Sequence, residues 1–485
     1  MYLGVDLGTS SIKVVLSNET DGEHASARAP VETFYPAKGR VEQSPDDWIA
    51  AFECAMAALA ETAGEALARV EAIGFSGHMH TLLLLGKDGR PVRPASIWSD
   101  FRAVEEAQEL RRTGLADRLG VKPMPGFTGP KLLWTARHDP KALADAACFA
   151  FPKDYLRQHL TGEIATDPTD AAGSWLFDQA SRTWDSETFE ACAAASLSRP
   201  ALVGSGEVAG VLRAEIAQRF GMRPGIPVAT GAGDVAAGAA GLGVVSEGEG
   251  MISLGTSAQV FVARGSYRPA VGRAVHSHAH VAPGTWYDMA ALLNGASALG
   301  KTAGWLGYDS VQSLISAVEA RHSGPGTLLA LPYLAGERTP HDDPAARAAF
   351  VGMSATTETW ELALSMMEAI AFSLADGADA LGSLPDCFAL TGGGSRSPFL
   401  CQLIADVLDR PLVRSRGSEV GPALGAARLA RAAATRSTVA ECCPALPEEA
   451  VYLPDPARHA AYAERLEAYR ALYAGLSSTF LTLEA

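Results

Sequence analysis

Two acidic residues, Asp6 and Asp234, each stand beside a glycine-rich turn that could bind phosphate groups. Asp6 ends an apolar run just before Gly8-Thr9-Ser10, and an acid inside an apolar strand needs a cation or hydrogen-bond donors as partners. Asp234 follows Gly231-Ala232-Gly233 and opens a stretch of small residues that leaves room for a ligand, although an Asp at a helix start is often a simple N-cap. The pattern predicts an anion-binding site with carboxylates beside it.

The glycine clusters include a repeat that organises the whole chain. Residues 5–10 (VDLGTS) return about half a chain later as residues 252–257 (ISLGTS), and each copy runs on into β-type residues, at 12–16 and at 260–263. Each copy is therefore expected to form a hairpin with a Gly turn, whose bare N–H groups and hydroxyls suit phosphate oxygens. A chance match of the letters LGTS is the alternative, but the shared strand context favours two related lobes.

Helices and strands alternate between these hairpins, which predicts an α/β fold. Ser44 followed by Pro45 is a good helix start. The expected helices are 48–63, 360–380, 398–408 and a terminal amphipathic helix over 455–480, and the expected strands include 72–76 and 388–390. The Gly393-Gly394-Ser395 turn joins the last of these strands to the helix at 398. We expect a first lobe over 1–245, a second lobe over 246–432, and a helical tail over 433–485 packed on the second lobe.

Composition excludes several classes of protein. The chain has 485 residues, a net charge of −15 and 48% hydrophobic residues, which is ordinary for a globular protein and unsuited to binding nucleic acid or an anionic membrane. No signal peptide and no stretch long enough to span a membrane is visible, so a cytoplasmic location is expected. Seven cysteines without a CxxC pair argue against disulfides and a cysteine zinc site. The P-loop pattern and a GxGxxG after the first strand are both absent.

The chain resembles the FGGY carbohydrate kinases of the actin-like ATPase superfamily, and within them the xylulokinases. Motifs typical of the family occur in family order across nearly the whole chain: 2–13 (YLGVDLGTSSIK), 76–80 (SGHMH), 98–102 (WSDFR), 124–134 (MPGFTGPKLLW), 151–155 (FPKDY), 231–238 (GAGDVAAG), 253–257 (SLGTS), 331–341 (LPYLAGERTPH), 391–397 (TGGGSRS) and 421–427 (GPALGAA). The resemblance implies two lobes of the ribonuclease H-like fold around a central cleft. It also implies a reaction, the transfer of a phosphoryl group from ATP, with Mg²⁺, to a ketopentose such as D-xylulose.

The resemblance also assigns roles to residues. Asp234 would be the general base, and Asp6 would help to hold Mg²⁺, with Asp234 as a second candidate ligand. Sugar contacts would come from Met79, His80, Trp98, Asp100 and Asp234 on the first lobe. The ATP contacts would be Gly8, Thr9, Ser10, Lys13, Gly255 and Thr256 for the phosphates, and Gly393, Gly394 and Ser395 for the adenosine. The expected partners are therefore a small sugar and ATP; a homodimer is left open.

Four positions depart from the usual pattern of the pentulose kinases. Val235 stands where Asn is common after the catalytic Asp, Thr81 where Gly is common, His78 where Gln is common and Ser99 where Asn is common. Losing an amide beside the sugar can shift specificity strongly. D-xylulose is the leading substrate, with another ketopentose or a pentitol as the alternative.

Two rival functions remain open at this level. His276, His278 and His280 alternate, so they face one side of a strand, and with His78 and His80 they could bind a transition metal of a hydrolase. The simpler interpretation is a set of polar residues on a partly exposed strand or at the rim of the sugar lobe. A non-catalytic, actin-like nucleotide-binding protein is the second rival, because the same fold hosts it. The inserted segment 76–155 favours a small ligand over that alternative.

Overall fold

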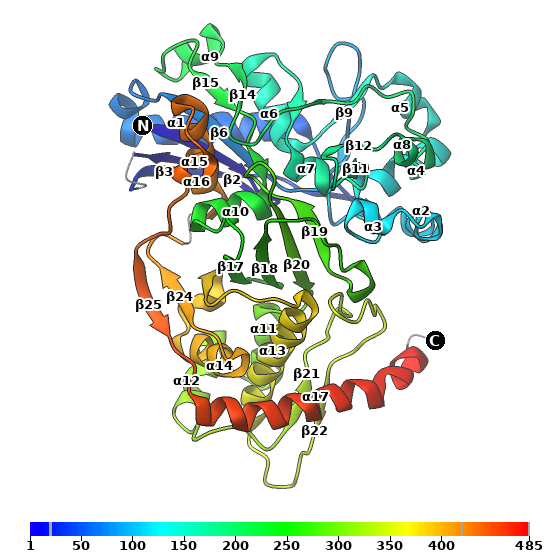
Figure 1. The fold of residues 1–485 in the computed structure, drawn as a ribbon, viewed down its shortest axis with the longest axis vertical. Helices are drawn as coiled ribbons and strands as arrows, with labels where there is room; N and C mark the ends of the chain where they lie inside the picture. The colour runs from blue at the N-terminus through cyan, green and yellow to red at the C-terminus, as the bar shows by residue number, and fades with distance from the viewer. Residues whose placement is uncertain (19–21, 419–420, 484–485) are drawn as a thin grey trace.

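The computed structural model describes residues 1–18, 22–418 and 421–483, and it consists of two α/β lobes, each built on a seven-stranded mixed sheet. In the first sheet the order is β14 (Val208–Val211), β15 (Pro227–Ala229), β6 (Ala72–Gly77), β1 (Tyr2–Leu7), β2 (Ser11–Ser17) and β3 (Glu23–Pro30), with β16 (Ala232–Gly233) beside β6. In the second it is β19 (His276–Ala279), β20 (Trp286–Leu292), β18 (Ala258–Arg264), β17 (Gly250–Leu254), β23 (Phe388–Thr391), β24 (Leu412–Ser415) and β25 (Glu448–Tyr452). The expected two-lobed α/β fold is confirmed (Figure 1).

The repeated LGTS motifs form equivalent hairpins in the two sheets. β1 pairs antiparallel with β2 and parallel with β6. β17 pairs antiparallel with β18 and parallel with β23 in the same manner. The first turn is closed by a hydrogen bond from the Gly8 amide to the Ser11 carbonyl oxygen at 3.1 Å. The hairpins inferred from the sequence are therefore present, and each one is flanked by a further strand on both sides.

Most of the expected helices are present with small differences at their ends. The helix α1 (Pro45–Leu67) begins at Pro45, but the Ser44 hydroxyl makes no cap hydrogen bond, and the helix is kinked at Ala63. The helices α13 (Thr359–Leu381), α14 (Pro398–Leu408) and α17 (Pro456–Leu483) correspond to the other three predictions. The segment expected to be a helical tail also contains a strand, β25, which completes the edge of the second sheet.

Two helices near the middle of the molecule connect the lobes. The helix α10 (Asp234–Leu242) packs against α15 (Gly421–Thr435), and α15 lies across β1 and β6 of the first sheet although it follows the second sheet in sequence (Figure 1). This contact needs bare backbone: a Cβ on Gly4 would lie 1.9 Å from the Ala423 carbonyl oxygen, and one on Gly425 would lie 1.8 Å from that of Ala237. The division into lobes at residues 245 and 432 stays a prediction.

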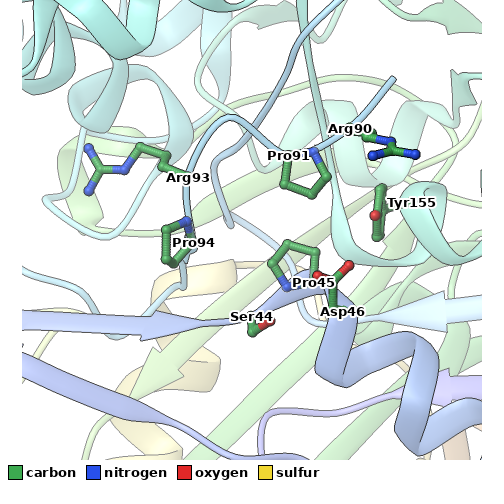
Figure 2. A pocket seen from close by; sticks show the side chains of 8 residues that line it. All are labelled: Ser44, Pro45, Asp46, Arg90, Pro91, Arg93, Pro94 and Tyr155. Carbon is green, nitrogen blue, oxygen red and sulfur yellow. The ribbon is translucent and has the colours of Figure 1, made fainter. Parts of the chain in front are cut away.

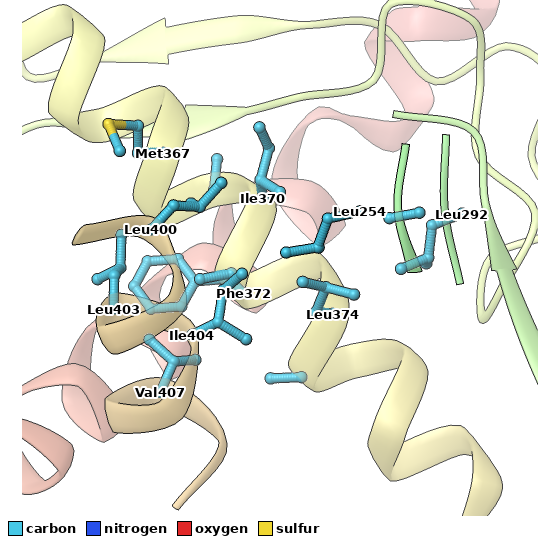
Figure 3. Packing of buried hydrophobic residues seen from close by; sticks show 14 of the residues in the cluster. Leu254, Leu292, Met367, Ile370, Phe372, Leu374, Leu400, Leu403, Ile404 and Val407 are labelled. Carbon is cyan, nitrogen blue, oxygen red and sulfur yellow. The ribbon is translucent and has the colours of Figure 1, made fainter. Parts of the chain in front are cut away.

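The second lobe has its largest apolar core beneath the sheet. Side chains of α13 and α14, among them Phe372, Leu374 and Ile404, pack together with Leu254 from β17 and Leu292 from β20 (Figure 3). Leu254 and Leu292 lie next to the turns that face the cleft, so burial of apolar surface below fixes the position of these turns. The terminal helix α17 covers the outer side of this core.

Two further observations concern the helices and the cysteines of the described residues. None of their helices is both long enough and apolar enough to cross a membrane. None of the seven cysteines, all of which lie in the described segments, is in a disulfide; Cys54 and Cys387 are exposed, whereas four others are buried.

Candidate active site

Strand register brings Asp6 and Asp234 together. Asp6 on β1 pairs with Ser76 on β6, and Ala232 on β16 pairs with the same Ser76 from the other side. The chain then turns through Gly233, so that Asp234 starts α10 at the end of this sheet. On its other side Asp6 faces Lys13 of β2. Residues far apart in sequence therefore form one acidic centre at the carboxyl end of the strands.

The electrostatics of this centre suit a general base beside a cation site. Burial and, to a smaller extent, the charge of Asp6 raise the pKa of Asp234 to about 7. Burial also raises the pKa of Asp6 to about 6, opposed by Ser76 and by Lys13. The Oδ1 atom of Asp6 is buried and has no hydrogen-bond partner among the described residues. A carboxyl with a pKa near neutrality can accept a proton in the reaction and release it afterwards.

The first phosphate-type turn is tied to the neighbouring pocket. The Trp98 indole donates a hydrogen bond to the Thr9 hydroxyl at 2.8 Å, and Gln43 donates to the Thr9 carbonyl oxygen at 2.7 Å. Ser10 is exposed. The turn is thus held from below, while its outer surface is left open to a ligand.

The second phosphate-type turn is held by the start of α11 (Ala296–Trp305). The Ala296 amide donates to the Gly255 carbonyl oxygen at 2.8 Å, and the Ser297 hydroxyl donates to the Thr256 carbonyl oxygen at 2.6 Å. A Cβ on Gly295 would lie 2.7 Å from the Gly255 carbonyl oxygen, so glycine is needed for this approach. The N-terminus of α11 therefore lies directly behind a turn predicted to hold phosphate, where its dipole favours negative charge.

A cavity of about 540 Å³ lies between the lobes and contains most of the predicted sugar contacts. Met79, His80 and Trp98 line it from the first lobe, Asp234 and Val235 line it from α10, and Thr256 lines it from the second lobe. Phe127, Gln259, His276 and Arg338 line it as well. None of these four was predicted to contact the sugar; His276 was a candidate only for a metal site, and Phe127 and Arg338 lie inside motifs that carried the resemblance. For Phe127 and Arg338, the position inside a family motif was the feature of the sequence that could have pointed to the cavity.

His80 is held in one orientation. Its backbone has a positive φ of 67°, its Nδ1 atom lies 2.6 Å from the Gly173 carbonyl oxygen, and its ring stacks on Phe127 at 4.2 Å. Burial lowers its pKa to about 3, so the ring is neutral. Gly173 is required here, because a Cβ would lie 2.9 Å from the His80 ring and 2.7 Å from Met79. His80 can therefore offer a fixed, neutral imidazole to a sugar hydroxyl.

Asp100 does not lie where its predicted role requires. It is fully buried and does not line the cavity. Its Oδ2 atom accepts from the Val41 amide at 2.6 Å, and both oxygens accept from the Arg102 guanidinium, at 2.7 and 2.8 Å. The contacts to sugar that were expected of Asp100 are thus replaced by an internal ion pair, which fixes the loop that carries Trp98.

The departures from the usual pattern fall into two groups. His78 and Thr81 are both buried and bond to each other, with Nδ1 and Oγ1 2.8 Å apart, so these two changes compensate one another inside the lobe. Of the four departures only Val235 lines the cavity. Any effect on substrate choice therefore depends on Val235.

The alternating histidines are buried and do not form a metal site with acidic residues. His276, His278 and His280 are all at most 4% exposed, so the expectation of a partly exposed strand was wrong; the sheet packs against the first lobe there. Nε2 of His280 lies 2.9 Å from the Val244 carbonyl oxygen, and Nδ1 of His278 lies 3.3 Å from the Tyr287 hydroxyl. Within the described ranges, no group of three His, Cys, Asp or Glu residues could hold a metal ion. The hydrolase alternative loses its main support.

A separate pocket of about 530 Å³ opens beside the last glycine cluster. Gly393 and Ser395 line it, together with Thr391, Arg396 and Gly421. Gly394 is packed against Leu254, and a Cβ there would lie 2.9 Å from the Leu254 Cβ. Bare backbone at Gly393, with no atom within 4 Å of its missing Cβ, leaves space for a flat group such as a purine or a ribose.

Volume alone does not locate the site. A cavity of about 570 Å³ lies on the outside of the first lobe, between the start of α1 and the loop carrying Arg90 and Arg93, and none of the predicted site residues lines it (Figure 2). Arg93 is already paired with Glu42 at 3.0 Å and with Asp139 at 3.1 Å. The inter-lobe cavity is identified as the candidate site by the predicted site residues that line it, and not by its volume.

Behind Asp234 lies a buried ionic network that the sequence analysis missed. Lys153 Nζ lies 2.6 Å from Asp154 Oδ1, 3.1 Å from Asp167 Oδ1 and 3.4 Å from Asp170 Oδ2, and all four side chains are at most 1% exposed. The Thr169 hydroxyl donates to Asp167 at 2.6 Å and accepts from the Gly233 amide at 2.9 Å. The network thereby anchors the turn before Asp234. The Lys-Asp pair of the FPKDY motif was the only signal of it in the sequence.

Ion pairs join the two lobes at the mouth of the cavity. Asp342 of the second lobe lies 2.8 Å from Lys122 Nζ and 3.1 Å from Arg111 Nη1 of the first. Nearby, the Ser277 amide donates to the Gly120 carbonyl oxygen at 2.7 Å. These contacts link the two lobes beside the cavity.

We expect Asp342→Asn to weaken ligand binding between the lobes. Asn keeps the left-handed backbone of Asp342 (φ 48°) but loses both ion pairs, and exposed pairs contribute about 0.2–1 kcal/mol each. The KM for a ligand that binds between the lobes should rise about 2- to 10-fold at low salt, and the difference from the wild type should shrink at high salt. Asp145→Asn, which breaks the surface pair with Lys141, is the control. An unchanged KM at low salt would show that the pairs do not contribute to closure.

Comparison with known proteins agrees with this arrangement. A model described as the FGGY family of carbohydrate kinases, N-terminal domain, matches residues 1–241, and the corresponding C-terminal domain model matches residues 250–434. The chain is 40% identical over 479 residues to the xylulose kinase of Escherichia coli strain K12 and 39% identical over 485 residues to that of Klebsiella pneumoniae. The first alignment covers 98% of both chains; the second covers 98% of this chain and 99% of its relative. A crystal structure titled as a xyloylose kinase from Brucella ovis superimposes with a TM-score of 0.95 at 36% identity, covering 99% of each chain.

Proposed function

Because the chain belongs to the FGGY family of carbohydrate kinases, we propose that it transfers the γ-phosphoryl group of ATP to the terminal hydroxyl of a ketopentose, with D-xylulose as the leading substrate. The observation that carries this proposal is the convergence of Asp234, Met79, His80 and Thr256 on one inter-lobe cavity. Relatives that are xylulose kinases, similar along the whole chain, support the choice of sugar.

The geometry suggests how the reaction proceeds. The sugar lies against Met79 and His80, with its terminal hydroxyl at Asp234. The Asp234 carboxylate takes the hydroxyl proton while the sugar oxygen forms a bond to the γ-phosphorus and the bond from that phosphorus to the bridging oxygen breaks, which releases ADP. The turns at Gly8-Thr9 and Gly255-Thr256 hold the phosphate chain, and the pocket at Gly393 and Ser395 takes the adenosine.

Mg²⁺ is the metal that this reaction class requires, and the residues fit it. The Oδ1 atom of Asp6, which has no hydrogen-bond partner among the described residues, and the rise that the charge of Asp6 causes in the pKa of Asp234 support a place for a cation. Mg²⁺ usually binds one or two carboxylates together with substrate phosphates. When bound it neutralises the developing charge on the phosphates. Asp6 would hold it, and Asp234 is the second candidate ligand.

The experiment that tests the proposal is an assay of ADP release with a panel of sugars. Purified protein with ATP and Mg²⁺ should turn over a ketopentose at a typical kinase rate, about 1–100 s⁻¹, with D-xylulose preferred over other ketopentoses, aldoses and pentitols. Slow ADP release without sugar measures transfer to water and serves as the baseline. Firm ATP binding without turnover of any sugar would contradict the proposal and favour a non-catalytic nucleotide-binding protein.

A further inference from the structure

Arg338 presents a positive charge to the site cavity. It lies in the segment 334–343 of the second lobe and lines the same cavity as Asp234 and His80. Over the described parts of the chain, its partly buried guanidinium makes no hydrogen bond and no ion pair. Burial lowers its pKa, and the charges of Glu337 and Asp342 oppose this effect. A guanidinium has five N–H donors, so a partly buried one that faces a cavity is expected to meet acceptors of a ligand.

The backbone that carries Arg338 is fixed on both sides. The Glu337 carboxylate accepts from the amides of Leu293 at 2.7 Å and of Arg338 itself at 2.8 Å, so it is already engaged by donors. The Thr339 hydroxyl accepts from the Ala291 amide at 3.1 Å and donates to the Ala274 carbonyl oxygen at 2.7 Å. The side chain therefore projects from a rigid base, as a group that selects a substrate requires.

Arg338 acts on the part of the cavity beside two histidines. Burial is the main cause that lowers the pKa of both His80 and His276, and the charge of Arg338 adds to it at both. At Asp234 the causes are burial, then Asp6 and nearby backbone groups. Arg338 and His276 also line a second, smaller cavity that Asp234 does not line, so Arg338 lies on the histidine side of the site, whereas Asp234 marks the place of phosphoryl transfer.

We infer that Arg338 determines specificity by donating hydrogen bonds to the keto oxygen of the sugar, at the end of the substrate remote from the transferred phosphoryl group. The inference rests on the proposed function. A carbonyl oxygen only accepts hydrogen bonds, which matches a group that only donates them. A pentitol carries a hydroxyl in the same place, and its proton must find another acceptor. Such a site discriminates between two substrates that differ at a single carbon.

The test compares two substrates in Arg338→Met, which keeps much of the side-chain length and loses all donors. The kcat/KM for the ketopentose should fall about 10- to 100-fold, as expected for the loss of a hydrogen bond from a charged group, while that for the matching pentitol should change less than about 3-fold. The KM for ATP should stay at the wild-type value. Arg338→Lys keeps the charge but lacks the planar guanidinium with its paired donors, so its kcat/KM for the ketopentose should show an intermediate loss.

Controls separate this inference from the proposed function. Arg112→Met, on the exposed surface of the first lobe, is the matched control, and melting temperatures show whether each variant folds. Calorimetric titration of each sugar without ATP gives the ratio of the two Kd values independently of turnover. If the wild type phosphorylates the ketopentose but Arg338→Met affects both sugars equally or neither, the inference is overturned and the function stands. If no sugar is bound or phosphorylated by the wild type, both are overturned.

Discussion

Replacing Asp234 by Asn should abolish most turnover while leaving ATP binding intact. The amide cannot take the proton of the sugar hydroxyl, and a positioned general base contributes about 10²–10⁴ in rate. The substitution preserves size, and the Val235 amide, which donates to Asp234 Oδ1 at 2.9 Å, can donate to the Asn carbonyl oxygen instead. We therefore expect kcat to fall at least 100-fold with little change in the affinity for ATP.

The measurement for this variant combines ADP-release kinetics with ATP titration. Asp409→Asn is a matched control, because Asp409 is exposed at the end of α14, has a left-handed backbone that Asn also tolerates, and lies outside the cavity. It should retain wild-type turnover. A turnover near the wild-type value in Asp234→Asn would remove Asp234 from the role of base, and Asp6 would then be the next carboxylate to examine.

Replacing Lys153 by Met should strongly destabilise the first lobe. Lys153 lies within 3.4 Å of carboxylate oxygens of Asp154, Asp167 and Asp170, and Arg157 lies 2.8 Å from Asp154. Burial raises the pKa of Asp170 well above its usual value, and the charge of Lys153 opposes this rise. Removing one partner of a buried ion pair costs about 3–5 kcal/mol, because the remaining charges are left without compensation.

Thermal and urea unfolding measure this loss, with Lys141→Met as the control. Lys141 also pairs with an aspartate, but its side chain is 83% exposed, so its replacement should change stability by less than about 0.5 kcal/mol. Folded Lys153→Met should in addition lose turnover, since Asp167 and Thr169 connect the network to the Gly233 amide just before Asp234. Equal unfolding midpoints for the two variants would show that the network does not support the lobe.

Local sequence patterns predicted much of the fold because turns, strands and helix starts depend largely on residues that are close in sequence. The LGTS turns, the strand at 72–76 and the helix starting at Pro45 follow from turn chemistry, alternation and helix-start preferences. The Ser44 side chain makes no capping hydrogen bond to α1, since a side chain at a helix start can point elsewhere at small cost. The strand β25 was missed because an edge strand at the end of a chain depends on its partner β24. The crossing of α15 onto the first sheet depends on glycines whose partners lie hundreds of residues away.

By itself, the sequence determined the two lobes, and it predicted that two acidic residues stand beside turns suited to phosphate, since these features depend on residue type and on nearby spacing. Only the tertiary structure decided which side chains share the cavity. It moved Asp100 into an internal ion pair, paired His78 with Thr81, and brought Arg338 into the cavity opposite the first lobe. The physical reason is that strand register and contacts between segments far apart in the chain decide whether a side chain is buried and which groups it contacts. No local pattern encodes those contacts.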